Sequence, residues 1–144
     1  MRTGAAAILL LMLAAPASAL EFVTTRQPAI LYDAPSITAA KVTVVSAGYP
    51  LEKLVASAGW VKVRDDAGKL AWIEETALGG KRTVLVMVPA IEARENPTED
   101  AAVRFRAARS VVLELLPGQN GGWAKVQHAS GQQGYVHIRD VWGM

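Results

Sequence analysis

Aromatic and cationic side chains alternate along residues 60–64, a segment predicted to form a short β-strand. Successive side chains of a strand point to opposite sides, so Trp60, Lys62 and Arg64 share one face while valines occupy the other. A large ring beside a cation offers a stacking surface together with a positive charge. This combination suits the binding of a peptide or a sugar.

The same arrangement returns 63 residues later, where Trp123 and Lys125 share the outer face of residues 123–127. In both places the next expected strand adds a second ring, Trp72 in the first case and Tyr135 in the second. The alternative is that these rings cover the end of a barrel or pack against a neighbouring unit. The candidate ligand-binding residues are Trp60, Lys62, Arg64, Trp72, Trp123, Lys125 and Tyr135.

Residues suited to catalysis or metal binding are scarce. The chain has no cysteine, and its two histidines, His128 and His137, occur in the second half without counterparts in the first. A nucleophile needs a positioned base, and the carboxylates are scattered through expected turns. Across a hairpin the two histidines could approach each other and hold a metal ion, but two solvated histidines are the simpler interpretation. We expect no enzyme activity, no cofactor and no metal site.

Arg104, Arg106 and Arg109 form the one basic cluster of the sequence. If Val103 and Phe105 turn inward on a strand, the first two arginines point to solvent. A solvated face is the simpler interpretation of this cluster. An anionic ligand of the cell envelope is the alternative.

Residues 1–19 have the composition of a secretory signal peptide. Arg2 supplies a positive charge, residues 5–15 are apolar, and the small residues 17–19 form the motif that signal peptidase cuts. A spanning helix needs about 20 apolar residues, so this segment is too short for one. We expect general secretory export, cleavage after Ala19, a periplasmic location and no membrane span afterwards. Without Arg2 the chain has 14 basic and 13 acidic residues, which does not favour nucleic acid binding.

The rest of the chain contains one unit written twice. Gly-Trp-x-Lys-Val at residues 59–63 recurs at 122–126, and upstream Ala29-Ile30 matches Ala90-Ile91 at a spacing of 61. A drifting spacing is expected when the loops of a duplicated fold differ in length. We expect repeats at residues 20–80 and 81–144. Four junction residues, 79–82, are too few for a flexible tether, so the repeats should pack as one rigid body.

Short apolar runs separated by turn residues predict an all-β fold. Residues 98–109 also have the composition of a helix, but the matching segment 36–46 does not, so we expect a loop and a strand there. Trp60 and Trp123 should be only partly buried, in front of a core that includes Val61, Val63, Ile73, Val126 and Val136. The expected strands are 22–25, 41–45, 51–56, 60–64, 70–73, 83–88, 103–105, 111–116, 123–127 and 134–138, with a 3₁₀ turn at 74–78.

Leu-Tyr-Asp-Ala-Pro-Ser at residues 31–36, Gly-Trp-Val-Lys-Val-Arg-Asp at 59–65 and Ala-Trp-Ile at 71–73 resemble the bacterial SH3-like (SH3b) domain. The junction at 79–83 and Val-Trp-Gly at 141–143 are similar to exported proteobacterial proteins with two such domains. The resemblance implies two tandem SH3-like small β-barrels, each partly open and five-stranded. It also implies binding to a cell-wall component, such as peptidoglycan or its peptides, or to an envelope protein.

Repeat 2 departs from the family pattern at residues 92–97, where a polar segment replaces the Leu-Tyr-Asp motif. Eukaryotic SH3 domains dock proline-rich ligands, but their closing Pro-x-x-Tyr element is missing, because residues 74–77 are Glu-Glu-Thr-Ala. We therefore expect a noncatalytic binding module of the periplasm. The alternatives are a structural or assembly factor whose aromatics are buried between the repeats, and an accessory unit of a hydrolase.

Overall fold

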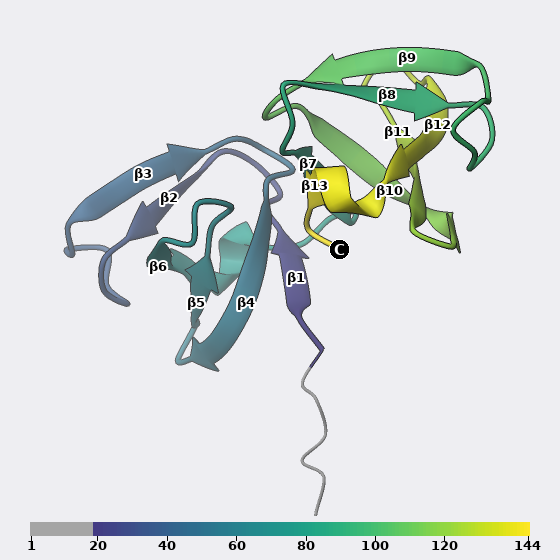
Figure 1. Ribbon diagram of the computed structural model, residues 1–144. Helices are drawn as coiled ribbons and strands as arrows, with labels where there is room; N and C mark the ends of the chain where they lie inside the picture. Colours follow the sequence, from purple (N-terminus) through teal and green to yellow (C-terminus); the bar gives the residue numbers. More distant parts are fainter. Residues whose placement is uncertain (1–18) are drawn as a thin grey trace, which may run out of the picture.

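The computed structural model describes residues 19–144 as two small β-barrels packed side by side (Figure 1). The predicted all-β fold and its tandem arrangement are confirmed. The expected signal peptide lies outside the described residues, except for Ala19. Within the described chain, no helix has the length and apolar character needed to cross a membrane.

The first sheet has six antiparallel strands in the order β1-β4-β5-β6-β2-β3. Strands β4, β5 and β6 form a meander, and the β2–β3 hairpin joins it through β6. A 3₁₀ turn, η1 (Glu75–Ala77), follows β6 where such a turn was expected. The strands are β1 (Glu21–Thr24), β2 (Ala29–Tyr32), β3 (Lys41–Val45), β4 (Pro50–Ser57), β5 (Trp60–Arg64) and β6 (Leu70–Glu74).

The second sheet repeats this topology and adds one strand, in the order β13-β7-β10-β11-β12-β8-β9. The short β13 pairs with β7 after a second 3₁₀ turn, η2 (Ile138–Asp140). The strands are β7 (Thr83–Val86), β8 (Ala90–Arg94), β9 (Val103–Ala108), β10 (Val112–Asn120), β11 (Trp123–Gln127), β12 (Gln133–His137) and β13 (Val141–Trp142).

Besides the two-residue β13, two strands were not among those predicted, β2 and β8. Both are short and begin just after a proline, Pro28 or Pro89, which is a turn signal in sequence. Each pairs on both sides, β2 with β3 and β6, and β8 with β9 and β12. Pairing on both sides keeps these segments extended, including β8, whose Ala, Glu and Arg residues do not favour a strand.

The strand register also corrects the alignment of the two repeats. Ala29 faces Val45 and Ile91 faces Ala107, and all four residues are buried. Ala29 thus corresponds to Ile91, at a spacing of 62, and not to Ala90. Burial decides the register, because a slip of one residue would turn every side chain of the strand to the other face.

Residues 98–109 form a turn followed by β9, so the predicted loop and strand are confirmed and the helical alternative is wrong. Phe105 and Ala107 are buried, while Arg104 and Arg106 are exposed. This period of two belongs to a strand with one face on the core. Pairing of β9 with β8 at five positions outweighs the helical preference of its alanines and arginines.

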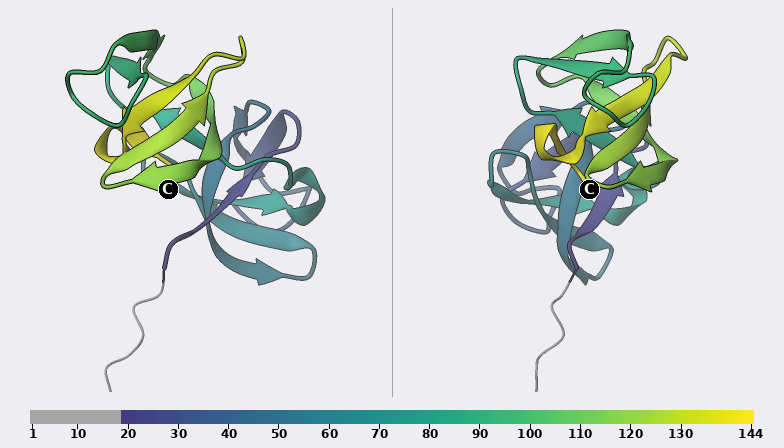
Figure 2. Two further views of the ribbon diagram at one scale, coloured as in Figure 1. Left: turned by 90° about the vertical axis from the view of Figure 1, so that its right-hand side faces the viewer. Right: turned by 45° about the vertical axis from the view of Figure 1, so that its right-hand side comes forward.

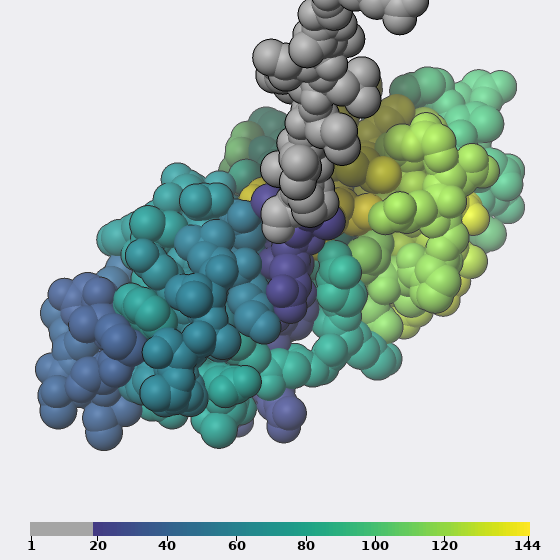
Figure 3. Space-filling model, turned by 90° about the horizontal axis from the view of Figure 1, so that it is seen from below, coloured from purple at the N-terminus to yellow at the C-terminus, as the bar shows by residue number. Residues whose placement is uncertain are grey.

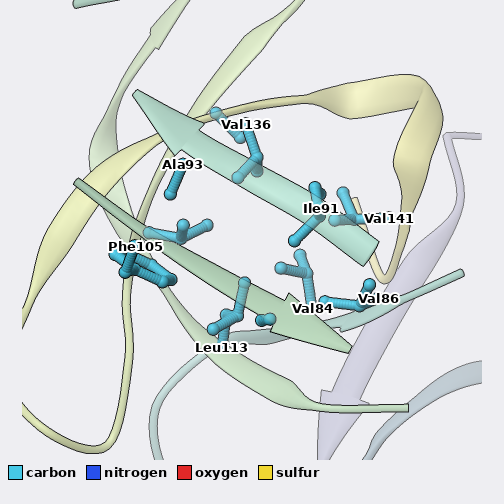
Figure 4. Packing of buried hydrophobic residues seen from close by; sticks show 11 residues of the cluster. Val84, Val86, Ile91, Ala93, Phe105, Leu113, Val136 and Val141 are labelled. Atoms are coloured by element: carbon cyan, nitrogen blue, oxygen red, sulfur yellow. The ribbon is translucent and has the colours of Figure 1, made fainter. Parts of the chain in front are cut away.

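Each barrel has its own hydrophobic core. The core of repeat 2 joins β7, β8, β9, β10 and the β11–β12 hairpin around Val84, Leu113 and Phe105 (Figure 4). The core of repeat 1 is built on Leu31 and Leu51. The five residues predicted to be buried are all at most 2% exposed: Val61, Val63, Ile73, Val126 and Val136.

The two repeats also contact each other directly. The C-terminal end of the chain lies beside β1 in each view (Figure 1, Figure 2), where the rings of Phe22 and Trp142 meet edge to face at 5.0 Å. Thr83 Oγ1 donates a hydrogen bond of 2.7 Å to the carbonyl of Gly48. Gly143 has a φ of +117°, and a Cβ there would lie 2.8 Å from Thr83 O and 3.2 Å from Pro50, so the close packing requires glycine.

Candidate ligand-binding face

The meander of repeat 1 brings its predicted site residues onto adjacent strands. In the β5–β6 register Lys62 lies opposite Trp72, and Trp60 lies opposite Glu74. Trp60, Lys62 and Trp72 are each half-buried, so part of each side chain remains accessible. We call these three residues, on the side of the strands away from the valines, the aromatic face of repeat 1.

A groove of about 190 Å³ opens at Trp72 and is lined also by Asp33, Lys62, Leu70 and Ala71. We call it the Trp72 groove. It combines an indole ring, an exposed leucine, a cation and a carboxylate. Asp33 and Leu70 were not predicted as site residues. Asp33 belongs to the Leu-Tyr-Asp motif, and Leu70 lies two positions before Trp72 on the same face of β6. Both could therefore have been predicted as site residues from the sequence.

Tyr32 packs beside this face, on the same side of the sheet. It pairs with Trp72 between β2 and β6, and its ring meets that of Trp60 edge to face at 5.4 Å. Such aromatic pairs contribute about 0.5–1.5 kcal/mol beyond the area they bury. Tyr32 is 8% exposed, so it positions Trp60 and offers little surface to a ligand.

Arg64, unlike the other candidates of repeat 1, forms an ion pair with a buried carboxylate. Its Nη1 donates a hydrogen bond of 2.9 Å to Glu52 on β4, and Glu52 is 7% exposed. A buried carboxylate needs a charged partner, so Arg64 serves the fold even though part of its side chain reaches solvent.

Trp123 is 8% exposed, which corrects the expectation that it is partly buried. Its ring lies 3.8 Å from that of His137, the residue opposite it on β12. The loop after β8 brings a carboxylate oxygen of Glu99 to 2.6 Å from His137 Nε2. Repeat 1 has a loop of the same length after β2, but Ile37 and Glu74 stand where repeat 2 has Glu99 and His137. The ring of His137 on Trp123 therefore explains why Trp60 and Trp123 differ in exposure.

The other two candidates of repeat 2 form a cross-strand row. Lys125 lies opposite Tyr135, which pairs with Arg94 on β8, and all three are half-buried. The tip of the β10–β11 hairpin comes close to this row. A Cβ at Gly118 would lie 3.5 Å from Lys125 and 4.0 Å from the Tyr135 hydroxyl. Repeat 2 therefore presents a smaller and more covered surface than repeat 1.

The two histidines lie at opposite ends of the β11–β12 hairpin, so the idea that they approach each other is wrong. His137 faces Trp123 at one end. At the other, the ring of His128 lies 5.6 Å from that of Phe105 and its Nδ1 is 3.0 Å from Ser130 Oγ. Among residues 19–144, no group of three potential ligands is placed to hold a metal ion.

Each arginine of the basic cluster has a partner within repeat 2. Arg104 contacts Glu95 at 3.3 Å and Arg106 contacts Glu92 at 3.6 Å. Arg109 donates a hydrogen bond to the carbonyl of Met87. Arg104 and Arg106 point to solvent as expected, and each has a carboxylate nearby, although Glu92 is shared by Arg106 and Arg94.

Tyr49 ties the turn before β4 to the loop after β5. Its hydroxyl donates a hydrogen bond to Asp66, and its N–H donates to Thr25 Oγ1 at 2.9 Å. Burial, the bond to Asp66 and the charges of Asp66 and Asp65 raise the pKa of Tyr49 above its ordinary value of 10.0. The hydroxyl is therefore kept as a neutral donor that holds this loop, which leads into Leu70.

Solved structures similar to this chain include three proteins at low identity. NlpC2 and NlpC1 from Trichomonas vaginalis are 14% and 15% identical over 86% and 93% of this chain, with TM-scores of 0.38 and 0.37. An NlpC/P60 family protein from Bacillus cereus ATCC 10987 is 16% identical over 85% of it, with a TM-score of 0.40. This chain spans about half of each of them: 48%, 50% and 56% of their lengths. Comparison with curated proteins gave no match.

A family model gives the clearer relation. The model of the bacterial SH3 domain, a module that binds cell-wall components, matches residues 25–80 and again residues 88–143. The two matches cover most of the chain and correspond to the two barrels. The chain belongs to the bacterial SH3 domain family.

Proposed function

We propose that the protein is a noncatalytic binding module of the periplasm that recognises peptidoglycan or its peptides through the aromatic face of repeat 1. The observation that carries the proposal is the Trp72 groove, where an accessible indole lies beside Lys62 and Asp33. Peptides present carboxylates and amines, which these two charges would pair, and the ring would stack on the chain or on a sugar.

The seven candidate residues take different roles in this proposal. Trp60, Lys62 and Trp72 contact the ligand, and Lys125 with Tyr135 forms a second, smaller contact surface in repeat 2. Arg64 acts through Glu52, as a positioning residue of the β4–β5 hairpin. Trp123 supports the fold of repeat 2, because its ring is buried against His137.

Co-sedimentation with purified cell-wall sacculi tests this assignment. Trp72→Ala should reduce retention on sacculi and leave the melting temperature nearly unchanged, because the valine core behind the face stays packed. Val44→Ala, at an exposed position on the edge strand β3, is the matched control and should be retained like the unaltered protein. Equal retention of both variants would contradict binding through the Trp72 groove.

The second candidate function is that of a structural or assembly factor, which binds a protein partner in the cell envelope. Trp123 is buried, as this alternative requires of the aromatics, but it is buried against His137 within repeat 2 and not between the repeats. Among the described residues, the aromatic contact between the repeats is Phe22 with Trp142, and neither is a candidate site residue. Unaltered protein that ignores sacculi but is captured by one envelope protein through Trp72 would favour this function over peptidoglycan binding.

We further propose that residues 1–19 are a signal peptide removed after Ala19, and that the repeats span residues 20–80 and 81–144. Family membership supports a location outside the cytoplasm. The intact mass of protein recovered from the periplasm should correspond to a chain that begins at Leu20. Recovery at the full 144-residue mass with membranes would contradict export and cleavage.

A further inference from the structure

A groove of about 460 Å³ lies where repeat 1 passes into repeat 2. Its walls come from β1, from Lys53 on β4, from the junction Leu78–Gly80 and from Arg82 at the start of repeat 2. In the space-filling view the junction crosses between the repeats next to β1 (Figure 3). The volume is within the roughly 300–1,000 Å³ of ligand pockets, which often occur between domains.

The charge of this groove is predominantly positive. Arg26, Lys53 and Arg82 line it, against a single carboxylate, Glu75. Lys53 also contacts Glu21 at 3.4 Å. Both side chains are partly or largely exposed, so this ion pair is weak and leaves Lys53 able to attract a ligand. An anionic ligand would therefore be attracted to the junction.

The two arginines are fixed in place by backbone carbonyls. Arg26 Nε donates to the carbonyl of Leu78 at 2.7 Å, and Arg82 Nη2 donates to that of Gly143 at 2.7 Å. Within residues 19–144 their other N–H groups have no recorded partner. A guanidinium that is hydrogen-bonded on one side still has free N–H donors, which can form two parallel hydrogen bonds with a carboxylate. Because the side chain is already fixed, it loses less conformational entropy when a ligand binds.

The glycines of the junction make this arrangement possible. A Cβ at Gly79 would lie 2.4 Å from Arg26 Nε, and Gly79 has a φ of +135°. Gly80, with a φ of +97°, has open space where its side chain would be, so its backbone remains approachable. The positions of repeat 2 that match Arg26 are Val88 or Pro89, which carry no charge. The positively charged groove therefore belongs to the junction and not to the repeated fold.

We propose that the junction groove is a second ligand site, separate from the aromatic face, which binds a short peptide bearing free carboxylates. Arg26 and Arg82 pair with the carboxylates. Phe22 and Leu78 contact the apolar part of the peptide. Because Arg82 comes from repeat 2 and the other wall from repeat 1, the site requires both repeats.

NMR titration of the purified protein tests the site. The probe is the peptide acetyl-Glu-Glu-Ala-Ala-amide, and its neutral match is acetyl-Gln-Gln-Ala-Ala-amide. The charged peptide should shift the backbone amide signals of Gly79 and Gly80, less so at high salt, and should do so equally in the Trp72→Ala variant, whose aromatic face is altered. No shift, or equal shifts with the neutral peptide, would overturn the proposal.

The double variant Arg26→Gln, Arg82→Gln should bind the charged peptide about tenfold more weakly or worse. The double variant Arg106→Gln, Arg139→Gln is the matched loss of two positive charges outside the groove, at exposed arginines, and should bind like the unaltered protein. Equal weakening by this control would show nonspecific attraction and overturn the site. The comparison of charged and neutral peptides needs no variant, so it decides the question even if the double variant loosens the junction.

Discussion

Glu52 is a buried carboxylate whose charge is balanced by Arg64 on the neighbouring strand. Arg64 looked like a ligand-binding residue because it follows Trp60 and Lys62 on one face. The sequence shows on which face of β5 Arg64 lies. It does not show that Arg64 forms an ion pair with the buried Glu52 of β4. The role of Arg64 thus becomes clear only from the β4–β5 register.

Arg64→Ala should destabilise the protein by about 1–3 kcal/mol in urea unfolding. The loss leaves the carboxylate of Glu52 buried without a partner, and water reduces the cost because Arg64 is partly exposed. Arg106→Ala, which breaks an exposed pair with Glu92, should change stability by no more than about 0.5 kcal/mol. Equal effects of the two substitutions would contradict the assignment of Arg64 to the fold.

The raised pKa of Tyr49 predicts a pH dependence. The unfolded chain releases this proton near pH 10 and the folded chain only at higher pH, so the stabilisation is fully present below pH 10. It is lost as the pH rises from there towards the folded-state pKa. Unfolding free energy should therefore fall more steeply above pH 10 in the unaltered protein than in Tyr49→Phe. Parallel curves would contradict the buried bond to Asp66.

The equivalent strands β5 and β11 each begin with a tryptophan, but the two rings lie in different surroundings. The β5 and β11 strands match residue by residue, and both place their valines in the core as predicted. The burial of Trp123 was not predictable in the same way, because it depends on His137 across the hairpin and on a loop that folds back with Glu99. Strands β2 and β8 were missed for a related reason: distant pairing, not local composition, makes them extended.

Trp123→Ala should cost about 3–5 kcal/mol, the usual loss for a buried tryptophan. Trp60→Ala should cost less, roughly 1–2 kcal/mol, because part of the side chain already faces water. Thermal or urea unfolding of the two single variants measures the difference. A Trp60 variant that is as unstable as the Trp123 variant would mean that the ring of Trp60 serves packing and not ligand contact.

At the scale of the whole molecule, the repeats share contacts that neither could make alone. Thr83 donates a hydrogen bond to the carbonyl of Gly48, and Phe22 meets Trp142 from the other repeat. The short junction was a sequence signal for close packing, but the residues that make the contact were not identified in advance. Phe22 and Trp142 lie near opposite ends of the chain, and sequence gives no direct measure of such a distance.

Residues 20–80 and 81–144, expressed separately, should each unfold at lower urea concentration than the whole chain. Separation exposes the rings of Phe22 and Trp142 to water, and this apolar area no longer contributes to stability. Mixing the two halves should recover part of the loss if they associate. Halves that match the stability of the whole chain would show that the repeats do not support each other.

The four tryptophans provide the most direct test of the central claim, that the aromatic face of repeat 1 binds cell-wall peptides. Trp60 and Trp72 lie on that face, Trp123 is buried in repeat 2, and Trp142 packs between the repeats. Their indole N–H signals can be followed by NMR while soluble peptidoglycan fragments are added. The expected result is that the signals of Trp72 and Trp60 shift while that of Trp123 stays in place. Trp142 is not a reference signal, because it contacts Phe22 of the junction groove. Shifts confined to Trp123 or Trp142, or no shift at all, would contradict the claim.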